Sequence, residues 1–253
     1  MTQKNTRNDV GILEFQNTGL FLKAHLSQYL GLGVDDLERL LPRSKDSLAN
    51  LHPGSFQFDD PTSFYEENVG TGHLLELAAW HLTSVDYISE TLRLQEMFAS
   101  GQVLDFGGGI GTHALVAAAM QDVDHVWFVD LNPDNRSFVE KRASLLGLSD
   151  KISFHRDLTS TDNVLFDTVI CFDVLEHLPD PSSQLKIFLE RMPKNGVTLL
   201  NWYFFKGNDG EYPFHFDDPK MIDDFFRTLQ SNFLEIFHPL LITARAYKAI
   251  SKK

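Results

Sequence analysis

The sequence predicts an α/β fold, a doubly wound and mostly parallel sheet of seven strands that ends in an antiparallel hairpin. From residue 101 onward, short apolar segments alternate with helical patterns, which is the order that builds parallel sheets. The first apolar segment enters a glycine-dense turn over residues 105–112 and then an alanine-rich helical pattern. The last two apolar segments lie too close together for an intervening helix, so we expect them to pair antiparallel at the sheet edge.

The elements of this sheet region follow from the apolar runs and the helix start signals. Pro133 and the pair Asp218–Pro219 stand where helices are expected to begin, because proline suits the first helical position and aspartate caps it. Strands are expected at residues 102–106, 125–129, 151–156, 166–172, 197–203, 233–237 and 242–247. Helices are expected at residues 112–121, 133–147, 181–192 and 218–230.

Residues 1–98 differ in character and are expected to form an N-terminal helical cap, or substrate lid, over a catalytic domain of residues 99–253. Residues 20–30 and 35–41 carry short amphipathic helical patterns. Residues 52–68 are rich in Pro, Asp and Phe and predict a loop with turns. Residues 71–98 carry a long helical pattern, with a break expected near Ser84.

Composition argues against several functional classes. The formal net charge is −13 and no Lys/Arg cluster is present, so we expect no nucleic-acid partner. Cys171 lies alone in an apolar run, which predicts a buried and unreactive thiol. The polar first nine residues and the lack of an apolar run of about 20 residues predict neither a signal peptide nor a membrane span. A cytoplasmic location is the resulting expectation.

The glycine-dense turn is the most informative motif, because glycines let a ligand approach bare backbone at a helix N-terminus. Residues 109–114 also fit the G-x-G-x-x-G/A dinucleotide pattern, so NAD is an alternative ligand on this motif alone. Further features favour another cofactor. Asp105 precedes the first glycine, acids close the next three strands, and the segment Asp173-Val174-Leu175-Glu176-His177 follows the fourth strand.

With these motifs the chain resembles the class I S-adenosylmethionine-dependent methyltransferases. The resemblance covers about residues 98–253 and rests on residues 103–115, 128–132, 154–158, 166–181 and 197–203. A D-x-G-x-G-x-G run together with D-V-L-E-H is far more specific than either motif alone. The family implies the Rossmann-like sheet, and S-adenosyl-L-methionine as cofactor. This ligand has no phosphate, so its site needs close backbone approach and acids for its ammonium and ribose hydroxyls.

The resemblance implies that the cofactor lies at the carboxyl ends of the strands. The residues that would line its methionine and ribose side are Gly107, Gly109 and Gly111. Phe172 and Asp173 would end the fourth strand beneath the methionine moiety.

The remaining cofactor contacts are implied at the acids and their neighbours. Asp105 would orient the glycine turn, and Asp130, with Leu131 beside it, would accept both ribose hydroxyls. Asp157 would accept the adenine amino group while Leu158 lends a backbone N–H. Each acid also has a purely structural alternative. Asp105 and Asp130 suit helix caps, and Asp157 suits a surface turn. For Asp173 the alternative is a hydrogen bond within a turn.

The loop after the fifth strand, residues 201–217, is too long and aromatic for a simple connector and is expected to contact substrate. His215 is the best candidate for a catalytic general base. The alternative is a histidine packed at the helix entry. Substrate contacts are expected from Trp202, Tyr203, His177, and from Tyr65 and His73 of the cap, with Glu66 and His81 as further mouth residues.

No metal is expected. His73 and His81 are separated by roughly 12 Å along a continuous helix and cannot bind one ion together. One of them with His215 and Asp217 would form a two-His-one-carboxylate site, which is kept as an alternative.

Taken together, the sequence predicts a methyltransferase that acts on a small-molecule metabolite or natural-product intermediate in an enclosed aromatic pocket. One alternative is a non-methylating enzyme on the same fold, such as a decarboxylase or cyclase. Another is a non-catalytic partner subunit that keeps the cofactor pocket. An NAD-dependent oxidoreductase would leave residues 173–177 unexplained. No membrane partner is expected, and a homodimer is left open.

Overall fold

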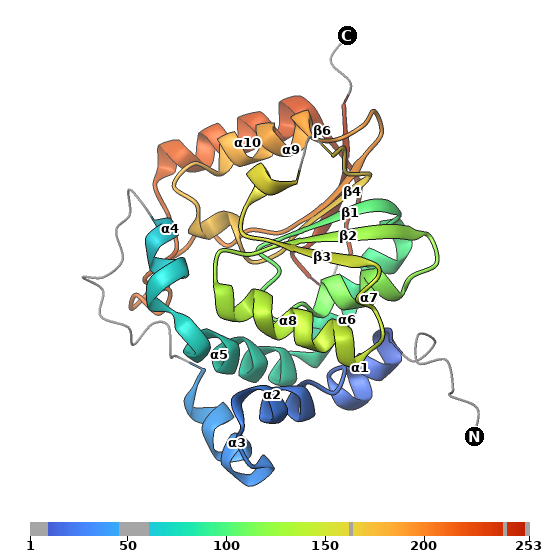
Figure 1. Ribbon diagram of the computed structural model, residues 1–253. Helices are drawn as coiled ribbons and strands as arrows, with labels where there is room; N and C mark the ends of the chain where they lie inside the picture. Colours follow the sequence, from blue (N-terminus) through green and yellow to red (C-terminus); the bar gives the residue numbers. More distant parts are fainter. Residues whose placement is uncertain (1–9, 46–60, 162–163, 240–241, 251–253) are drawn as a thin grey trace.

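The computed structural model describes residues 10–45, 61–161, 164–239 and 242–250. At its centre is a seven-stranded sheet of order β3-β2-β1-β4-β5-β7-β6 (Figure 1). Strands β1 to β5 are parallel, and β7 runs antiparallel between β5 and β6. The strands are β1 Gly101–Phe106, β2 Val123–Val129, β3 Ile152–His155, β4 Thr168–Cys171, β5 Val197–Leu200, β6 Phe233–Phe237 and β7 Arg245–Ala249. The predicted sheet and its terminal antiparallel hairpin are confirmed.

Successive strand residues face opposite sides of the sheet and build two cores. In β1, the fully buried Val103 belongs to the core under α6, α7 and α8, and Leu104 to the core under α9 and α10. Figure 1 shows these two groups of helices on opposite sides of the strands. The helices are α6 Val85–Phe98, α7 Thr112–Ala119, α8 Pro133–Leu145, α9 Pro181–Glu190 and α10 Pro219–Asn232.

The N-terminal helices gather on the side of α6 and α8 (Figure 1). They share a small core with Ile110, in the glycine turn, and Phe138 of α8. Helix α6 lies within the sheet core itself, so the division into a cap of residues 1–98 and a domain of residues 99–253 stays a prediction. The elements before α6 are α1 Ile12–Thr18, α2 Leu22–Leu30, α3 Val34–Leu40, the 3-10 turn η2 Leu41–Arg43, α4 Pro61–Ser63, the π-helical η4 Phe64–Asn68 and α5 Gly70–Thr83.

Part of the expected loop at residues 52–68 is wrong. Residues 61–68 are helical, and the rest of that range lies outside the described residues. The reason is a distant contact: the buried Phe64 packs its ring 4.9 Å from that of Phe214, which no local pattern reports. The expected break at Ser84 is confirmed, because this residue separates α5 from α6.

Several strand ends differ from the prediction for identifiable reasons. The strand expected to begin at Phe166 starts later, because the backbone N–H of Phe166 donates to the Arg191 carbonyl instead of to the sheet. The strand expected to reach Tyr203 ends at Leu200. The last strand is shifted to Arg245–Ala249 from the expected residues 242–247.

The composition led to expectations about Cys171 and about membrane-spanning helices. Cys171 is free and fully buried, and burial raises the pKa of its thiol well above the usual range, so the side chain is inert. Within the described ranges, no helix combines the length and apolar character needed to cross a bilayer.

Candidate functional site

The strand order reverses between β1 and β4, so the carboxyl ends of these strands border a crevice of the kind in which open α/β sheets bind ligands. The glycine turn follows β1, Asp130 follows β2, and Asp173 lies shortly after β4. The structure therefore places the main cofactor residues implied by the sequence at one edge of the sheet.

The glycine turn needs glycine at both of its ends. Gly107 has φ 71° and Gly111 has φ 75°, a left-handed conformation that other residues adopt at a cost. A Cβ atom on Gly107 would lie 2.4 Å from Val174, and one on Gly111 2.4 Å from Val139. Between them, Gly109 is covered by Leu77 of α5, whose Cδ1 would lie 3.0 Å from a Cβ at residue 109. The turn is thus held tightly between α8, the loop after β4 and the N-terminal helices.

Asp130 ties this turn to the end of β2. One carboxylate oxygen accepts the Gly109 backbone N–H at 2.8 Å, and the other accepts the Asn132 N–H at 2.8 Å and the Asn135 amide at 3.2 Å. The N-cap of α8 is Asn132, so the alternative role of Asp130 as that cap does not hold. Next to it, the Leu131 carbonyl accepts from Arg136 at 2.8 Å.

Asp105 is buried below the turn and accepts the backbone N–H of Ala114 in the first turn of α7. Its Oδ2 atom is buried without a hydrogen-bond partner. Burial, reinforced by the negative charge of Asp130, raises the pKa of Asp105 to about 7. From this position Asp105 can cap α7, and it can also orient the glycine turn. Its Oδ2 atom remains an acceptor without a donor beneath that turn.

Asp173 is held by Asn201, to which the sequence analysis assigned no role beyond its place at the start of the loop of residues 201–217. The Asp173 N–H donates to Asn201 Oδ1 at 2.6 Å, and the Asn201 amide donates to Asp173 Oδ1 at 2.6 Å. Asn201 also donates to the Tyr87 hydroxyl at 2.7 Å. Phe172 packs its ring 4.9 Å from that of His113, on the α7 side. These bonds fix Asp173 in its left-handed conformation, with φ 55°.

The acids of the crevice suit a positively charged ligand. Burial raises the pKa of Asp130 and of Asp173 to about 6 each, and that of Glu176 to about 8, with Asp173 adding to the shift of Glu176. A cation among these groups would stabilise their charged forms. The sulfonium and ammonium of S-adenosylmethionine are such cations, and the orphaned Asp105 oxygen lies on the same edge.

Asp157 has a local structural role. It caps the 3-10 helix η5, Leu158–Ser160, by accepting the Thr159 N–H at 2.9 Å, and it pairs with Arg156 at 2.6 Å. Arg156 also donates to both oxygens of Glu66, at 2.6 and 2.7 Å, which links the N-terminal region to the end of β3. The adenine contacts assigned to Asp157 and Leu158 stay predictions.

A second cluster brings together η4, α5, the 3-10 turn after β4 and the loop after β5. The rings of His177 and His215 lie 4.7 Å apart, and the Tyr65 hydroxyl lies 3.0 Å from His177 Nδ1. His73 lies on the other side of Tyr65, with ring centres 6.3 Å apart, and Tyr203 lies 5.8 Å from the His215 ring. The structure thus brings these predicted residues together, and their roles toward a substrate stay predictions.

Glu176 is the residue of this cluster that sequence reasoning missed. It is buried, and one ligand atom from each of Glu176, His177 and His215 lies within 4.8 Å of the other two. Its place in D-V-L-E-H was the available signal, but the expected ligand set used Asp217 instead. Asp217 pairs with Lys206 at 3.5 Å, and His81 hydrogen-bonds Thr112 at 3.1 Å, so neither belongs to this group.

The histidines of the cluster are neutral at physiological pH. Desolvation by burial lowers the pKa of His177 to about 3 and that of His73 to about 4. Desolvation also lowers the pKa of His215, opposed by hydrogen bonds to the carbonyls of Phe205 and Tyr203. A neutral imidazole can accept a proton or bind a cation.

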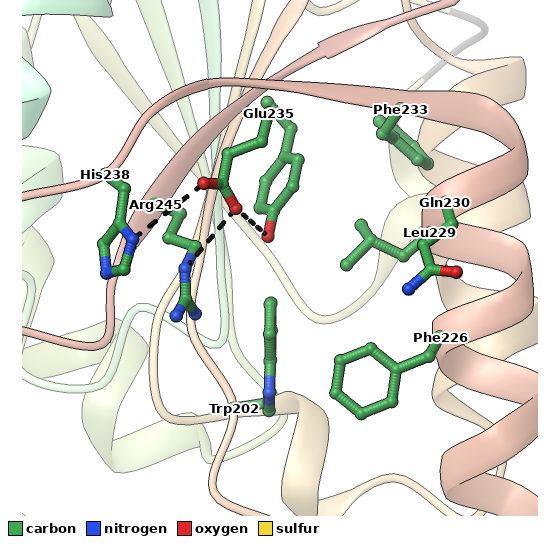
Figure 2. Close-up of a pocket in the computed structure, with 9 residues that line it drawn as sticks. Trp202, Phe226, Leu229, Gln230, Phe233, Glu235, His238 and Arg245 are labelled. Carbon is green, nitrogen blue, oxygen red and sulfur yellow. Dashed lines mark hydrogen bonds and ion pairs between the residues drawn. The ribbon is translucent and has the colours of Figure 1, made fainter.

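Trp202 is not part of either cluster. It packs against Phe225 and Phe226 of α10, with the Arg245 guanidinium 5.3 Å from its ring. There it lines an open pocket at the sheet edge, shown in Figure 2. Glu235 is paired there with Arg245 at 3.5 Å and accepts from Tyr247 at 3.1 Å, so these polar groups satisfy one another.

The chain is similar in sequence to known methyltransferases. A family model described as a methyltransferase domain matches residues 79–205, just over half of the chain. The mitochondrial ubiquinone biosynthesis O-methyltransferase of Schizosaccharomyces pombe is 28% identical over 137 residues, covering 52% of this chain and 48% of that protein. The ubiquinone biosynthesis O-methyltransferase of Xanthomonas oryzae is 29% identical over 133 residues, covering 49% and 51%. The chain thus spans about half the length of these relatives.

The fold also has a counterpart among solved structures. Geranyl diphosphate C-methyltransferase from Streptomyces coelicolor, solved with Mg²⁺, a substrate analogue and S-adenosyl-L-homocysteine, superimposes with a TM-score of 0.52. The alignment covers 73% of this chain and 82% of that one at 11% sequence identity. At this identity the likeness concerns the fold.

Proposed function

The chain belongs to the class I S-adenosylmethionine-dependent methyltransferase family, and we propose that it methylates a hydroxyl group of a small organic acceptor. The acceptor would lie between the crevice of the sheet and the aromatic residues of η4 and the loop after β5. A small acceptor suits the net charge of −13 better than RNA or DNA does. The names of the curated relatives, all O-methyltransferases of ubiquinone biosynthesis, support oxygen as the acceptor atom.

The residues at the carboxyl ends of β1, β2 and β4 would hold the cofactor. Bound there, S-adenosylmethionine supplies a methyl group on a positively charged sulfur. Asp105 and Asp173 would face its positive charges, and Asp130 with Leu131 would lie at the ribose. The backbone of the glycine turn would border the methionine moiety, with Phe172 below it. Asp157 and Leu158 remain the proposed adenine contacts at the end of β3.

The position of His215 carries the proposal. Its imidazole is neutral, lies against His177 and Tyr203, and is held by an Nδ1 contact of 3.1 Å with the Phe205 carbonyl. A carbonyl oxygen only accepts, so Nδ1 carries the proton and Nε2 is free to take one from an acceptor hydroxyl. Tyr65 and His73 would close the acceptor side from the N-terminal helices.

A methyl-transfer assay with methyl-labelled cofactor and a panel of phenols, catechols and aliphatic alcohols tests this function. We expect label in an O-methylated product. His215→Ala should lower kcat by about 10²–10⁴-fold while the dissociation constant of S-adenosylhomocysteine stays unchanged. The control is His125→Ala, which alters a histidine of β2 that is hydrogen-bonded to Ser153 of β3.

Two outcomes would contradict the proposal. Cofactor binding with turnover of an acceptor but no label in the product would indicate a non-methylating enzyme. Cofactor binding without turnover of any acceptor class would indicate a partner subunit.

A further inference from the structure

We propose that Glu176, His177 and His215 form a binding site for one divalent transition-metal ion of the Zn²⁺ class. One ligand atom from each residue lies within 4.8 Å of the other two. Among the residues that the structure describes, this is the one group of three or more His, Cys, Asp or Glu side chains that gathers so closely. The inference rests on the proposed methyl transfer and changes one part of it: with the ion bound, His215 serves as a metal ligand and not as the general base.

The carboxylate of Glu176 supplies an independent reason for a cation. The residue is 2% exposed, and its Oε2 atom is buried without a hydrogen-bond partner. A buried carboxylate oxygen with no donor is costly, and a coordinated cation removes that cost. Asp173 lies close enough to add negative charge at Glu176, which further favours a cation.

The two histidines are oriented as metal ligands usually are. Nδ1 of His215 lies 3.1 Å from the Phe205 carbonyl, and Nδ1 of His177 lies 3.3 Å from the Phe214 carbonyl. His177 Nδ1 also lies 3.0 Å from the Tyr65 hydroxyl, which can accept a hydrogen bond as a carbonyl does. A proton on each Nδ1 satisfies these acceptors and leaves the lone pair of each ring on Nε2. Metal-binding histidines commonly donate their second N–H to a carbonyl in this way.

The backbone holds the two ligand segments together. The Phe216 N–H donates to the Glu176 carbonyl at 2.7 Å, which joins the loop before α10 to the 3-10 helix η6, Leu175–His177. The ligands of tetrahedral zinc lie ~3.4 Å apart at bond lengths near ~2.1 Å, so modest side-chain rotations complete the site. Two imidazoles and one carboxylate favour Zn²⁺, Co²⁺ or Fe²⁺ over Mg²⁺.

Three protein ligands leave a position open for an oxygen of the acceptor. Methyl transfer would still break the C–S bond of the donor and form the C–O bond of the product. The acceptor proton would pass to water, because His215 Nε2 cannot bind a cation and a proton at once. A metal-bound hydroxyl ionises more readily than a free one, so the ion would make a side-chain base unnecessary.

The test is metal binding by the full-length protein after treatment with a chelator. Calorimetry with ZnCl₂ should give one ion per chain, and CoCl₂ should give a visible absorption band of four- or five-coordinate Co²⁺. Glu176→Gln and His215→Gln should each weaken Zn²⁺ binding by about 10–100-fold. His125→Gln, outside the cluster, should bind Zn²⁺ as the unaltered protein does.

Circular dichroism and S-adenosylhomocysteine affinity, measured on the same samples, separate lost ligands from lost folding. Cofactor binding without Zn²⁺ or Co²⁺ binding would overturn the metal site and leave the proposed function standing. Equal Zn²⁺ binding by Glu176→Gln and the unaltered protein would also overturn it. Tighter binding of Mg²⁺ than of Zn²⁺ would reject the ion class.

Discussion

Asp130 joins two tasks in one side chain, because it holds the Gly109 N–H and also lies where the cofactor ribose is expected. Asp130→Ala should weaken S-adenosylmethionine binding by at least about tenfold, since a charge-assisted pair of hydrogen bonds is removed. Calorimetric titration measures the effect. The variant should remain folded, because the fully buried residues of both cores are untouched.

The matched control is Glu140→Ala, which alters an exposed acid on α8, the helix that follows Asp130. It should leave cofactor affinity unchanged. Unaltered affinity in folded Asp130→Ala would mean that the ribose lies elsewhere along the crevice.

Asp105 should make folding stability depend on pH. Its pKa rises from the ordinary 3.8 to about 7 on folding, so the folded state binds the proton more tightly than the unfolded state does. Stability from this group is therefore full below pH 3.8, falls as the pH rises towards about 7, and is level above that. The total loss is on the order of 4 kcal/mol.

Burial also raises the pKa values of Asp130, Asp173 and Glu176, so these acids add to the pH dependence of stability. The contribution of Asp105 is therefore the difference in unfolding free energy between the unaltered protein and Asp105→Asn. Urea unfolding of both proteins at several pH values between 4 and 8 measures this difference. The Asn variant should show a shallower decline. Identical slopes would mean that Asp105 is charged in the folded protein.

Single residues were predictable where a motif fixes both their type and their place. The positions of the turn glycines, and of the acids at the carboxyl ends of β1, β2 and β4, were predictable in this way. Glu176 and Asn201 do not, because their roles depend on partners 28 or more residues away, such as Asp173 for Asn201. Asp157 also stands at a strand end, as the motif predicts. Its observed contacts, however, are a cap of the next 3-10 helix and an ion pair with Arg156.

At the scale of elements, the start of α7 depends on Gly111. Gly111→Ala should destabilise the fold by about 2–4 kcal/mol, because it adds a left-handed φ penalty to a contact of 2.4 Å with Val139. Urea unfolding provides the measurement.

Gly31→Ala measures the cost of the left-handed backbone conformation alone, without a steric clash. Gly31 ends α2 with φ 66°, and a Cβ there would meet nothing within 4 Å. It should cost only about 1 kcal/mol. Equal losses in the two variants would show that α8 shifts to make room at residue 139.

Periodicity predicted most helices and strands, because amphipathic patterns are local properties of the chain. It failed at α1, where seven residues bury a single Phe15 and no side chain caps the start. It also failed at residues 61–68, where the stabilising partner is Phe214. The end of β5 was missed because Asn201 turns its side chain to Asp173 rather than continuing the ladder.

At the scale of the molecule, the ion pair of Glu66 with Arg156 connects the N-terminal helices to the far end of the sheet. Arg156 is exposed and Glu66 is partly exposed, so Glu66→Ala should change the unfolding temperature little. It should instead raise KM for the acceptor several-fold with kcat nearly unchanged, because the closed arrangement around Tyr65 is less favoured.

Glu38→Ala, which breaks a more exposed pair with Lys23 between α2 and α3, should leave KM unchanged. Steady-state kinetics on both variants decide the matter. If the two variants behaved alike, the Glu66–Arg156 pair would have no part in holding the acceptor.

The sheet order and the place of the crevice were accessible through the family resemblance, since they follow from the shared fold. The contacts that bring η4 and α5 over the crevice were not. They depend on Tyr65 meeting His177 and on Leu77 covering Gly109, pairs separated by 112 and 32 positions. No local pattern encodes such distances.

Strand β7 follows all the other strands of the described sheet in sequence, yet it lies inside that sheet, between β5 and β6. During synthesis, the outer edge of β5 therefore stays unpaired until residues 245–249 have left the ribosome. Unpaired edges template association with other chains. The nascent protein thus depends on residues 245–249, and ribosomes that stall before residue 245 would release chains prone to aggregation rather than a smaller folded unit.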